Sequence, residues 1–161
     1  MLARGTANHS IIAVNITREL SILLRGSGCF IYNSDIKVRL SKSRYVLPDA
    51  TISCDPRDRK GKITTLHYPR VLFEVLSPST EGYDRGKKSS YYRACPSIEE
   101  YVLVDSDRRF IEVHRRSGEA FWFLSSFESG DEMQLASLGI SLPVDALYEN
   151  VLLAEAENED E

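Results

Sequence analysis

Glu74 is the residue whose surroundings point most directly to chemistry. It interrupts the apolar run Val71–Leu76, which is otherwise typical of a strand buried on both faces of a sheet. An ionised carboxylate without a partner would be strongly disfavoured in such a strand. Glu74 therefore needs a basic side chain, a metal ion or a raised pKa, and a simple salt bridge at the strand end is the alternative to a functional role.

Asp49 is a second carboxylate that the chain could bring to the same place. It follows Pro48 at the start of a predicted strand that runs to Cys54. If this strand pairs antiparallel with 71–76, its start lies beside the end of the other strand, so Asp49 and Glu74 converge. Two adjacent carboxylates favour a divalent cation between them, and oxygen ligands favour Mg2+ or Mn2+. Taken alone, Asp49 could equally be a turn residue after proline.

The segment after these strands supplies positive charge. Arg85, Lys88 and Tyr92 are three and four residues apart, so they share one face of a helix predicted over 84–94. A lysine that points inward could orient a nucleophilic water and stabilise charge on a phosphate. A solvated basic face is the alternative for this helix.

The elements that must position these residues indicate an α+β fold around one mixed sheet. Apolar spacing and capping residues, with Asn8 as the first cap, predict helices over 9–24, 84–94 and 144–148. Short β-prone segments predict strands over 29–32, 36–40, 45–54, 71–76, 101–104, 110–114 and 120–124. A basic loop covers 55–67 and contains Arg57, Arg59, Lys60 and Lys62.

The composition is that of one globular domain. The chain has 161 residues, of which 42% are hydrophobic and 27% charged, and we assign 1–153 to the domain and 154–161 to an acidic tail. The tail accounts for the formal net charge of -4, so charge alone neither requires nor excludes a nucleic-acid partner. No apolar run approaches the roughly 18 residues of a membrane span, which predicts a soluble, cytoplasmic protein without a membrane partner.

Cysteine usage gives a further expectation. Cys29, Cys54 and Cys95 are widely spaced, odd in number and without a C-x-x-C pair. This pattern argues against a disulfide framework and against a zinc site, so we expect three buried thiols.

An ordered series of motifs resembles the Uma-two family, whose members are proposed endonucleases of the restriction endonuclease-like PD-(D/E)XK superfamily. The likeness covers about 8–116, and the motifs are Leu47-Pro48-Asp49-Ala50, Phe73-Glu74-Val75-Leu76-Ser77-Pro78-Ser79-Thr80, Asp84-Arg85-Gly86-Lys87-Lys88 with Tyr92, and Pro96-Ser97-Ile98-Glu99-Glu100-Tyr101-Val102-Leu103-Val104-Asp105. The resemblance implies a mixed α/β sheet flanked by helices. It also implies that Asp49, Glu74 and the backbone carbonyl of Val75 hold the metal ion.

The same resemblance singles out one lysine. In the superfamily a lysine usually stands two places after the glutamate, but Leu76 occupies that place here. The family match moves the catalytic lysine to Lys88 rather than Lys87. His9 matches a histidine at the start of the family's first helix, where it faces the site or caps the helix.

These observations lead to a first hypothesis, a metal-dependent endonuclease that hydrolyses DNA. Asp49, Glu74 and Lys88 would be its catalytic residues. Candidate substrate-binding residues are His9, Arg85, Lys87 and Tyr92, and the basic loop 55–67 would also contact phosphates.

The rival hypothesis is a catalytically inactive module for binding or assembly that keeps the nuclease fold. It is motivated by the start of the chain at Met1, because members of the family usually carry a few tens of residues before the position of His9. That segment could supply a sheet edge. We therefore also expect a homodimer, formed where the apolar strands 110–114 and 120–124 leave the sheet uncovered.

Overall fold

A six-stranded mixed sheet organises the molecule. The computed structural model describes residues 5–77 and 81–154, so the acidic tail from residue 155 onward lies outside it. The strand order is β1-β4-β6-β7-β8-β9, with β6 and β7 parallel and the other neighbours antiparallel. These strands are β1 (Phe30–Asn33), β4 (Ala50–Ser53), β6 (Val71–Leu76), β7 (Glu100–Asp105), β8 (Phe110–Ser117) and β9 (Phe121–Glu128).

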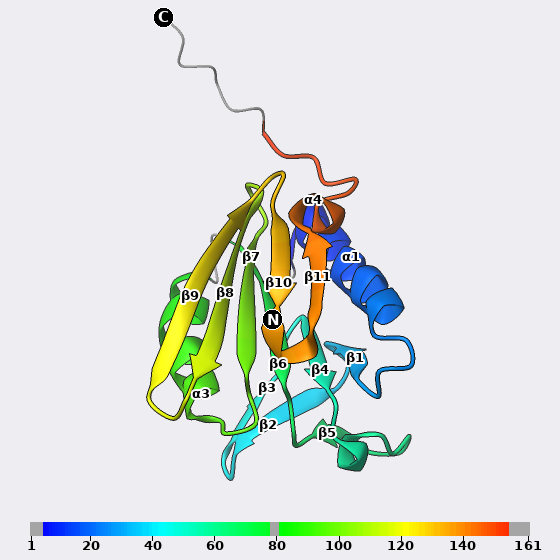
Figure 1. Cartoon of the computed structure of the whole chain (residues 1–161), viewed down its shortest axis with the longest axis vertical. Helices are drawn as coiled ribbons and strands as arrows, with labels where there is room; N and C mark the ends of the chain where they lie inside the picture. Colours follow the sequence, from blue (N-terminus) through cyan, green and yellow to red (C-terminus); the bar gives the residue numbers. More distant parts are fainter. Residues whose placement is uncertain (1–4, 78–80, 155–161) are drawn as a thin grey trace, which may run out of the picture.

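Helices and two smaller sheets cover the central sheet (Figure 1). The helical segments are α1 (Ala7–Leu23), α2 (Glu81–Tyr83), a π-helical turn (Asp84–Lys88), α3 (Ser89–Ala94) and α4 (Val144–Leu147). The smaller sheets contain β2 (Lys37–Ser41), β3 (Arg44–Val46) and β5 (Thr65–Leu66) in one, and β10 (Glu132–Leu135) and β11 (Ile140–Pro143) in the other. Short 3-10 turns occupy Pro56–Asp58 and Ala136–Leu138.

The two faces of the sheet build two cores. Along β6, Val71, Phe73 and Val75 pack with α1, α4 and the β10–β11 pair. Leu72 and Leu76 point the other way, into a core shared with β2, β5 and α3. All six residues of β6 are buried, so the apolar run in the sequence is explained by packing on both faces.

The register of β6 fixes where its carboxylate points. Strand side chains alternate between faces, so Glu74 shares the face of Leu72 and Leu76, on the side of α3. The antiparallel pairing of β4 with β6, predicted from the sequence, is confirmed.

One predicted strand is wrong. The segment 45–54 forms two strands, because β3 ends at Val46 and β4 begins at Ala50, and the two belong to different sheets. Pro48 lies between them, and a proline has no N–H to donate to a ladder. Asp49 is therefore in the connection directly before β4 rather than inside a strand.

Several helix and strand predictions hold with shifted ends. The first helix is capped by Thr6 and not by Asn8, since the Thr6 hydroxyl accepts a hydrogen bond from the His9 N–H. The helix predicted over 84–94 begins at Glu81 and includes the π-helical turn. Sequence patterns did not indicate β5, β10 or β11. None of the described helices is long and apolar enough to cross a membrane, and a cytoplasmic location stays a prediction.

The expectation of three buried thiols is wrong for two of the three cysteines. Cys29 and Cys54 form a disulfide, whereas Cys95 is a buried free thiol as expected. Phe30 pairs with Ser53 in the antiparallel β1–β4 ladder, so one further step along the ladder places Cys29 opposite Cys54, with 4.0 Å between their Cα atoms. Residues directly opposite in antiparallel strands are close enough to be bridged.

Candidate active site

The pairing of β4 and β6 brings the two predicted carboxylates to the same edge. Ala50 pairs with Phe73 and Thr51 with Leu72, so the next step of the register places Asp49 level with Glu74. The convergence predicted from the sequence therefore arises at the point where β4 begins and β6 approaches its end.

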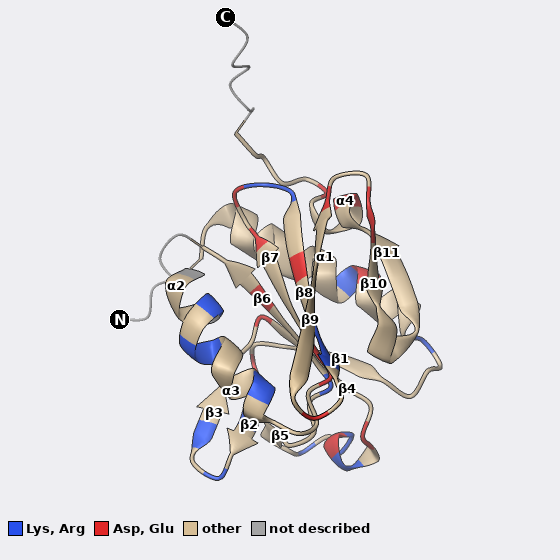
Figure 2. Cartoon of the chain, turned by 60° about the vertical axis from the view of Figure 1, so that its left-hand side comes forward, with Lys and Arg blue, Asp and Glu red and all other residues tan. Residues whose placement is uncertain are grey.

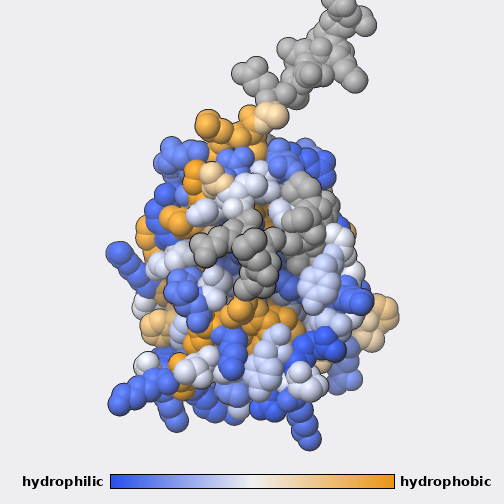
Figure 3. All heavy atoms as spheres, turned by 180° about the vertical axis from the view of Figure 1, so that it is seen from behind, coloured by the Kyte–Doolittle hydropathy of each residue, from blue (hydrophilic) through white to orange (hydrophobic). Residues whose placement is uncertain are grey.

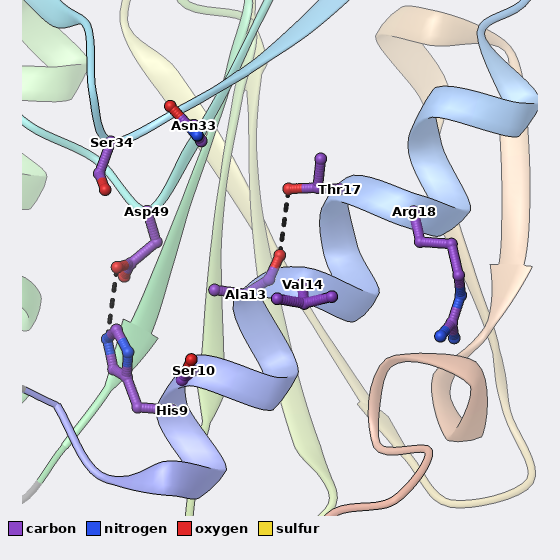
Figure 4. Close-up of a pocket in the computed structure, with 9 residues that line it drawn as sticks. All are labelled: His9, Ser10, Ala13, Val14, Thr17, Arg18, Asn33, Ser34 and Asp49. Atoms are coloured by element: carbon purple, nitrogen blue, oxygen red, sulfur yellow. Dashed lines mark hydrogen bonds and ion pairs between the residues drawn. The ribbon is translucent and has the colours of Figure 1, made fainter.

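Asp49 is held by contacts to both of its oxygens. Its Oδ2 accepts a hydrogen bond of 2.7 Å from the Val75 N–H, and its Oδ1 lies 3.3 Å from Nε2 of His9. His9 reaches this place from the first turn of α1 (Figure 4). Because the N–H and C=O of one strand residue point to the same side, the Val75 carbonyl is directed to the β4 side of β6.

Glu74 has partners that account for its burial. Its side chain is only 5% exposed, and Nζ of Lys88 lies 2.9 Å from Oε1. The Tyr92 hydroxyl donates a hydrogen bond to the same oxygen. A basic partner for Glu74 is expected whether its role is a structural salt bridge or catalysis. Lys88 is that partner.

The two neighbouring lysines separate as the sequence predicts. Lys88 lies in the π-helical turn and points to the sheet, with 17% of its side chain exposed. Lys87 is exposed to solvent. Successive residues of a helical turn point in different directions, so both lysines cannot reach Glu74.

Arg85, a predicted phosphate contact, pairs with a carboxylate on β8. Its Nη1 is 2.7 Å and 2.8 Å from the two carboxylate oxygens of Glu112, and both side chains are largely covered. Helical spacing places Arg85 on the same face as Lys88, but it does not reveal this carboxylate partner on β8. A phosphate contact by Arg85 stays a prediction, and in this structure its guanidinium is paired with Glu112.

Glu112 was missed by the sequence reasoning, although a signal was present. It interrupts the apolar strand residues Ile111 and Val113, as Glu74 interrupts its own strand. The register Glu74–Leu103–Glu112 places both carboxylates on the same face, two strands apart. Arg85 and Lys88 each contact one of them.

His114 extends this cluster of polar side chains. Its Nε2 lies 3.5 Å from Oε2 of Glu112, and its ring stacks on Tyr101 with 4.3 Å between centroids. Burial lowers the pKa of His114, and the neighbouring Glu112 carboxylate opposes that shift only in part. The fold therefore favours the neutral imidazole.

A cavity adjoins Asp49. It has a volume of about 510 Å3, and its lining includes His9, Ser10, Asn33, Ser34 and Asp49 (Figure 4). His9 and Asp49 lie side by side in its wall, joined by the contact between Nε2 and Oδ1 drawn in the figure. The Asp49 carboxylate, directly before β4, is thus accessible from a cavity.

The donor set fits a hard divalent cation. The carboxylates of Asp49 and Glu74 and the carbonyl of Val75 are all oxygen donors. Among the described residues, no group of three His, Cys, Asp or Glu is placed to hold a metal ion. Mg2+ commonly uses one or two protein carboxylates together with water and substrate phosphate, so two carboxylates fit Mg2+ or Mn2+ better than a closed zinc site.

The mixed sheet with helices and small sheets on its faces is a restriction endonuclease-like fold. It is similar to the crystal structure of a putative nuclease belonging to DUF820 from Anabaena variabilis, with a TM-score of 0.75. That match covers 93% of this chain and 85% of the other at 15% sequence identity, so it concerns the fold.

Residues 1–145 match the Uma2 family model, described as a putative restriction endonuclease, and the chain belongs to this family. Two relatives come from Synechocystis sp., and both are described as uncharacterized. The protein slr1290 is 38% identical over 145 residues, which cover 89% of this chain and 76% of the relative. The protein sll1609 is 29% identical over 126 residues, which cover 77% of this chain and 71% of the relative.

Proposed function

We propose that this protein is a metal-dependent endonuclease that hydrolyses phosphodiester bonds of DNA. The observation that carries the proposal is the buried carboxylate of Glu74 with Lys88 Nζ at 2.9 Å, one strand away from a second carboxylate, Asp49. Two carboxylates and a lysine at one strand end are the groups that metal-assisted phosphodiester hydrolysis needs. Membership of the Uma2 family supports the same activity.

Asp49, Glu74 and the Val75 carbonyl would hold Mg2+ or Mn2+. When bound, such a cation lowers the pKa of water and neutralises charge on the phosphate. The Val75 N–H fixes Asp49 by its hydrogen bond at 2.7 Å, so the carboxylate is preorganised. His9 restrains the other oxygen of Asp49 and is close enough to the cavity to contact substrate.

Lys88 would stabilise the negative charge that develops on the phosphate. Its ammonium group is held beside Glu74, so little rearrangement is needed at the moment of reaction. The Tyr92 hydroxyl restrains the same Glu74 oxygen from the next turn of the helical segment. Lys87, which is exposed on the same segment, is suited to hold a backbone phosphate.

The proposal is tested by nicking of supercoiled plasmid DNA with Mg2+ or Mn2+. Wild-type protein should nick the plasmid, and Asp49→Asn and Glu74→Gln should abolish nicking because each removes a ligand charge. Glu132→Gln is a matched control, since this exposed carboxylate lies on β10, on the opposite face of the central sheet. Nicking that survives Glu74→Gln, or that persists in EDTA, would overturn the proposal and leave the binding-module hypothesis.

A further inference from the structure

The hairpin formed by β2 and β3 concentrates positive charge. It carries Lys37, Arg39, Lys42 and Arg44, and no aspartate or glutamate occurs from residue 36 to residue 48. Lys37, Lys42 and Arg44 are exposed, and Arg39 is partly exposed. The hairpin is therefore basic along its length although the protein as a whole has a formal net charge of -4.

In the part of the chain that the structure describes, these charges have no acidic partners. Within 5–77 and 81–154, no carboxylate oxygen lies within 4.0 Å of the charged groups of the four hairpin residues. Five arginines elsewhere are paired with carboxylates, in Arg18–Glu149, Arg57–Asp55, Arg85–Glu112, Arg108–Asp105 and Arg109–Asp145. Like charges gathered without counter-charges repel one another, and a polyanion relieves that repulsion.

The hairpin is packed against the helical segment that reaches the candidate active site. The guanidinium carbon of Arg44 lies 3.4 Å from the ring centroid of Tyr91 on α3. The next residue, Tyr92, donates its hydroxyl hydrogen to Glu74. Figure 2 shows the basic residues of the hairpin and of the α2–α3 segment on the same side of the molecule. A phosphate backbone bound to the hairpin would thus continue toward Glu74 and Lys88.

Seen from behind, the lower rim of the molecule is hydrophilic (Figure 3). Figure 3 shows hydrophilic side chains projecting along the lower rim of that face, with an apolar area between them. The turn of the hairpin, at Lys42 and Ser43, is exposed. Such a tip can enter a groove without moving the rest of the sheet.

The shape favours a duplex over a single strand. A two-stranded β-ribbon fits the major groove of DNA, and β2 is braced on its other side by β5. Single-strand binders instead present a series of aromatic platforms. The hairpin offers one exposed aromatic ring, Tyr45, and that ring lies 5.1 Å from Nζ of Lys37.

We propose that the β2–β3 hairpin is a ribbon that binds the backbone of duplex DNA and positions it for the active site. The inference rests on the proposed endonuclease function and adds the surface that holds the substrate. The sequence also predicts phosphate contacts from the basic loop 55–67, in which Arg57 is paired with Asp55.

The test measures binding of a fluorescein-labelled DNA duplex by fluorescence anisotropy, in EDTA so that cleavage does not interfere. The double variant Lys37→Gln/Lys42→Gln removes two exposed charges. We expect about a tenfold or greater loss of affinity and a reduction of about 2 in the slope of log affinity against log salt, because each phosphate contact contributes about 0.9. Arg25→Gln, an exposed charge just beyond α1, should change neither quantity appreciably.

Several outcomes would overturn the proposal. These are an unchanged affinity and salt slope in the double variant, an equal loss in Arg25→Gln, tighter binding of a single strand or RNA, or no duplex binding by wild type. Lys42→Gln alone, at the turn, should lower the slope by about 1 and guards against misfolding of the double variant. If the hairpin proposal fails, the nicking test of Glu74→Gln still decides the endonuclease proposal, since that test does not depend on which surface binds DNA.

Discussion

The ammonium nitrogen of Lys88 lies 2.9 Å from Oε1 of Glu74, and the two residues come from different layers of the molecule. Glu74 belongs to the central strand β6, whereas Lys88 belongs to the π-helical turn that packs on that sheet face. The contact neutralises a buried carboxylate and fixes a cation beside the candidate metal ligands.

Lys88→Ala should lower plasmid nicking by about 10²- to 10³-fold, because removal of one group that stabilises transition-state charge typically has that effect. Lys87→Ala should retain nicking at saturating DNA, since its side chain is exposed and does not reach Glu74. Initial rates at saturating DNA measure the difference. Loss of activity in Lys87→Ala with full activity in Lys88→Ala would show that the assignment is reversed.

Mg2+ or Mn2+ should stabilise the folded protein. At ten times its dissociation constant, a ligand that binds only the folded state adds about 1.4 kcal/mol, which raises Tm by about 3–5 °C for a chain of this size. Asp49→Ala and Glu74→Ala should lose this increase, because each removes a ligand. The readout is thermal unfolding across a metal titration. Equal shifts in wild type and Glu74→Ala would count against the site.

The buried histidine predicts a loss of stability in mild acid. Burial lowers the pKa of His114 in the folded protein below its ordinary value of 6.5. As pH falls below about 6.5, the unfolded chain takes up a proton that the fold resists, so the stabilisation present at neutral pH is lost. His114→Gln should therefore lose less Tm than wild type between pH 7 and pH 5. His67→Gln, at an exposed histidine, should follow wild type.

The free edge of β9 predicts a homodimer. β9 is the last strand of the central sheet, and Phe121 and Phe123 on it are 72% and 56% exposed. The strand has one charged residue, Glu128 at its end, and lacks the lysines and prolines that usually protect an edge. Light scattering should give about twice the 18.2 kDa of one chain.

A charge on this edge should separate the two copies. Phe123→Lys should give a monomer, because two lysines would meet in a desolvated contact. Ile22→Lys places the same charge on α1, at a residue that is 53% exposed, and should remain dimeric. A wild-type mass of one chain at micromolar concentration would contradict the prediction.

The sequence by itself indicated the parts of the site that depend on local pattern. An apolar strand interrupted by one carboxylate predicted that Glu74 would be buried and would need a basic partner or a metal ion. Lys88 is that basic partner. Antiparallel pairing of β4 with β6 followed from two short β-prone segments joined by a loop, and it brings Asp49 level with Glu74. Sequence periodicity and turn residues are enough to predict these features, because they indicate which face of a strand or helix a side chain occupies.

Tertiary structure alone decided which distant residues meet. Arg85 pairs with Glu112, 27 positions later, because the register of three strands puts Glu112 in line with Glu74. Cys29 bonds to Cys54 because the β1–β4 ladder makes them opposite neighbours. Local sequence pattern does not reveal these contacts, since strand order and register are set by how the faces of the sheet pack against the covering helices and strands.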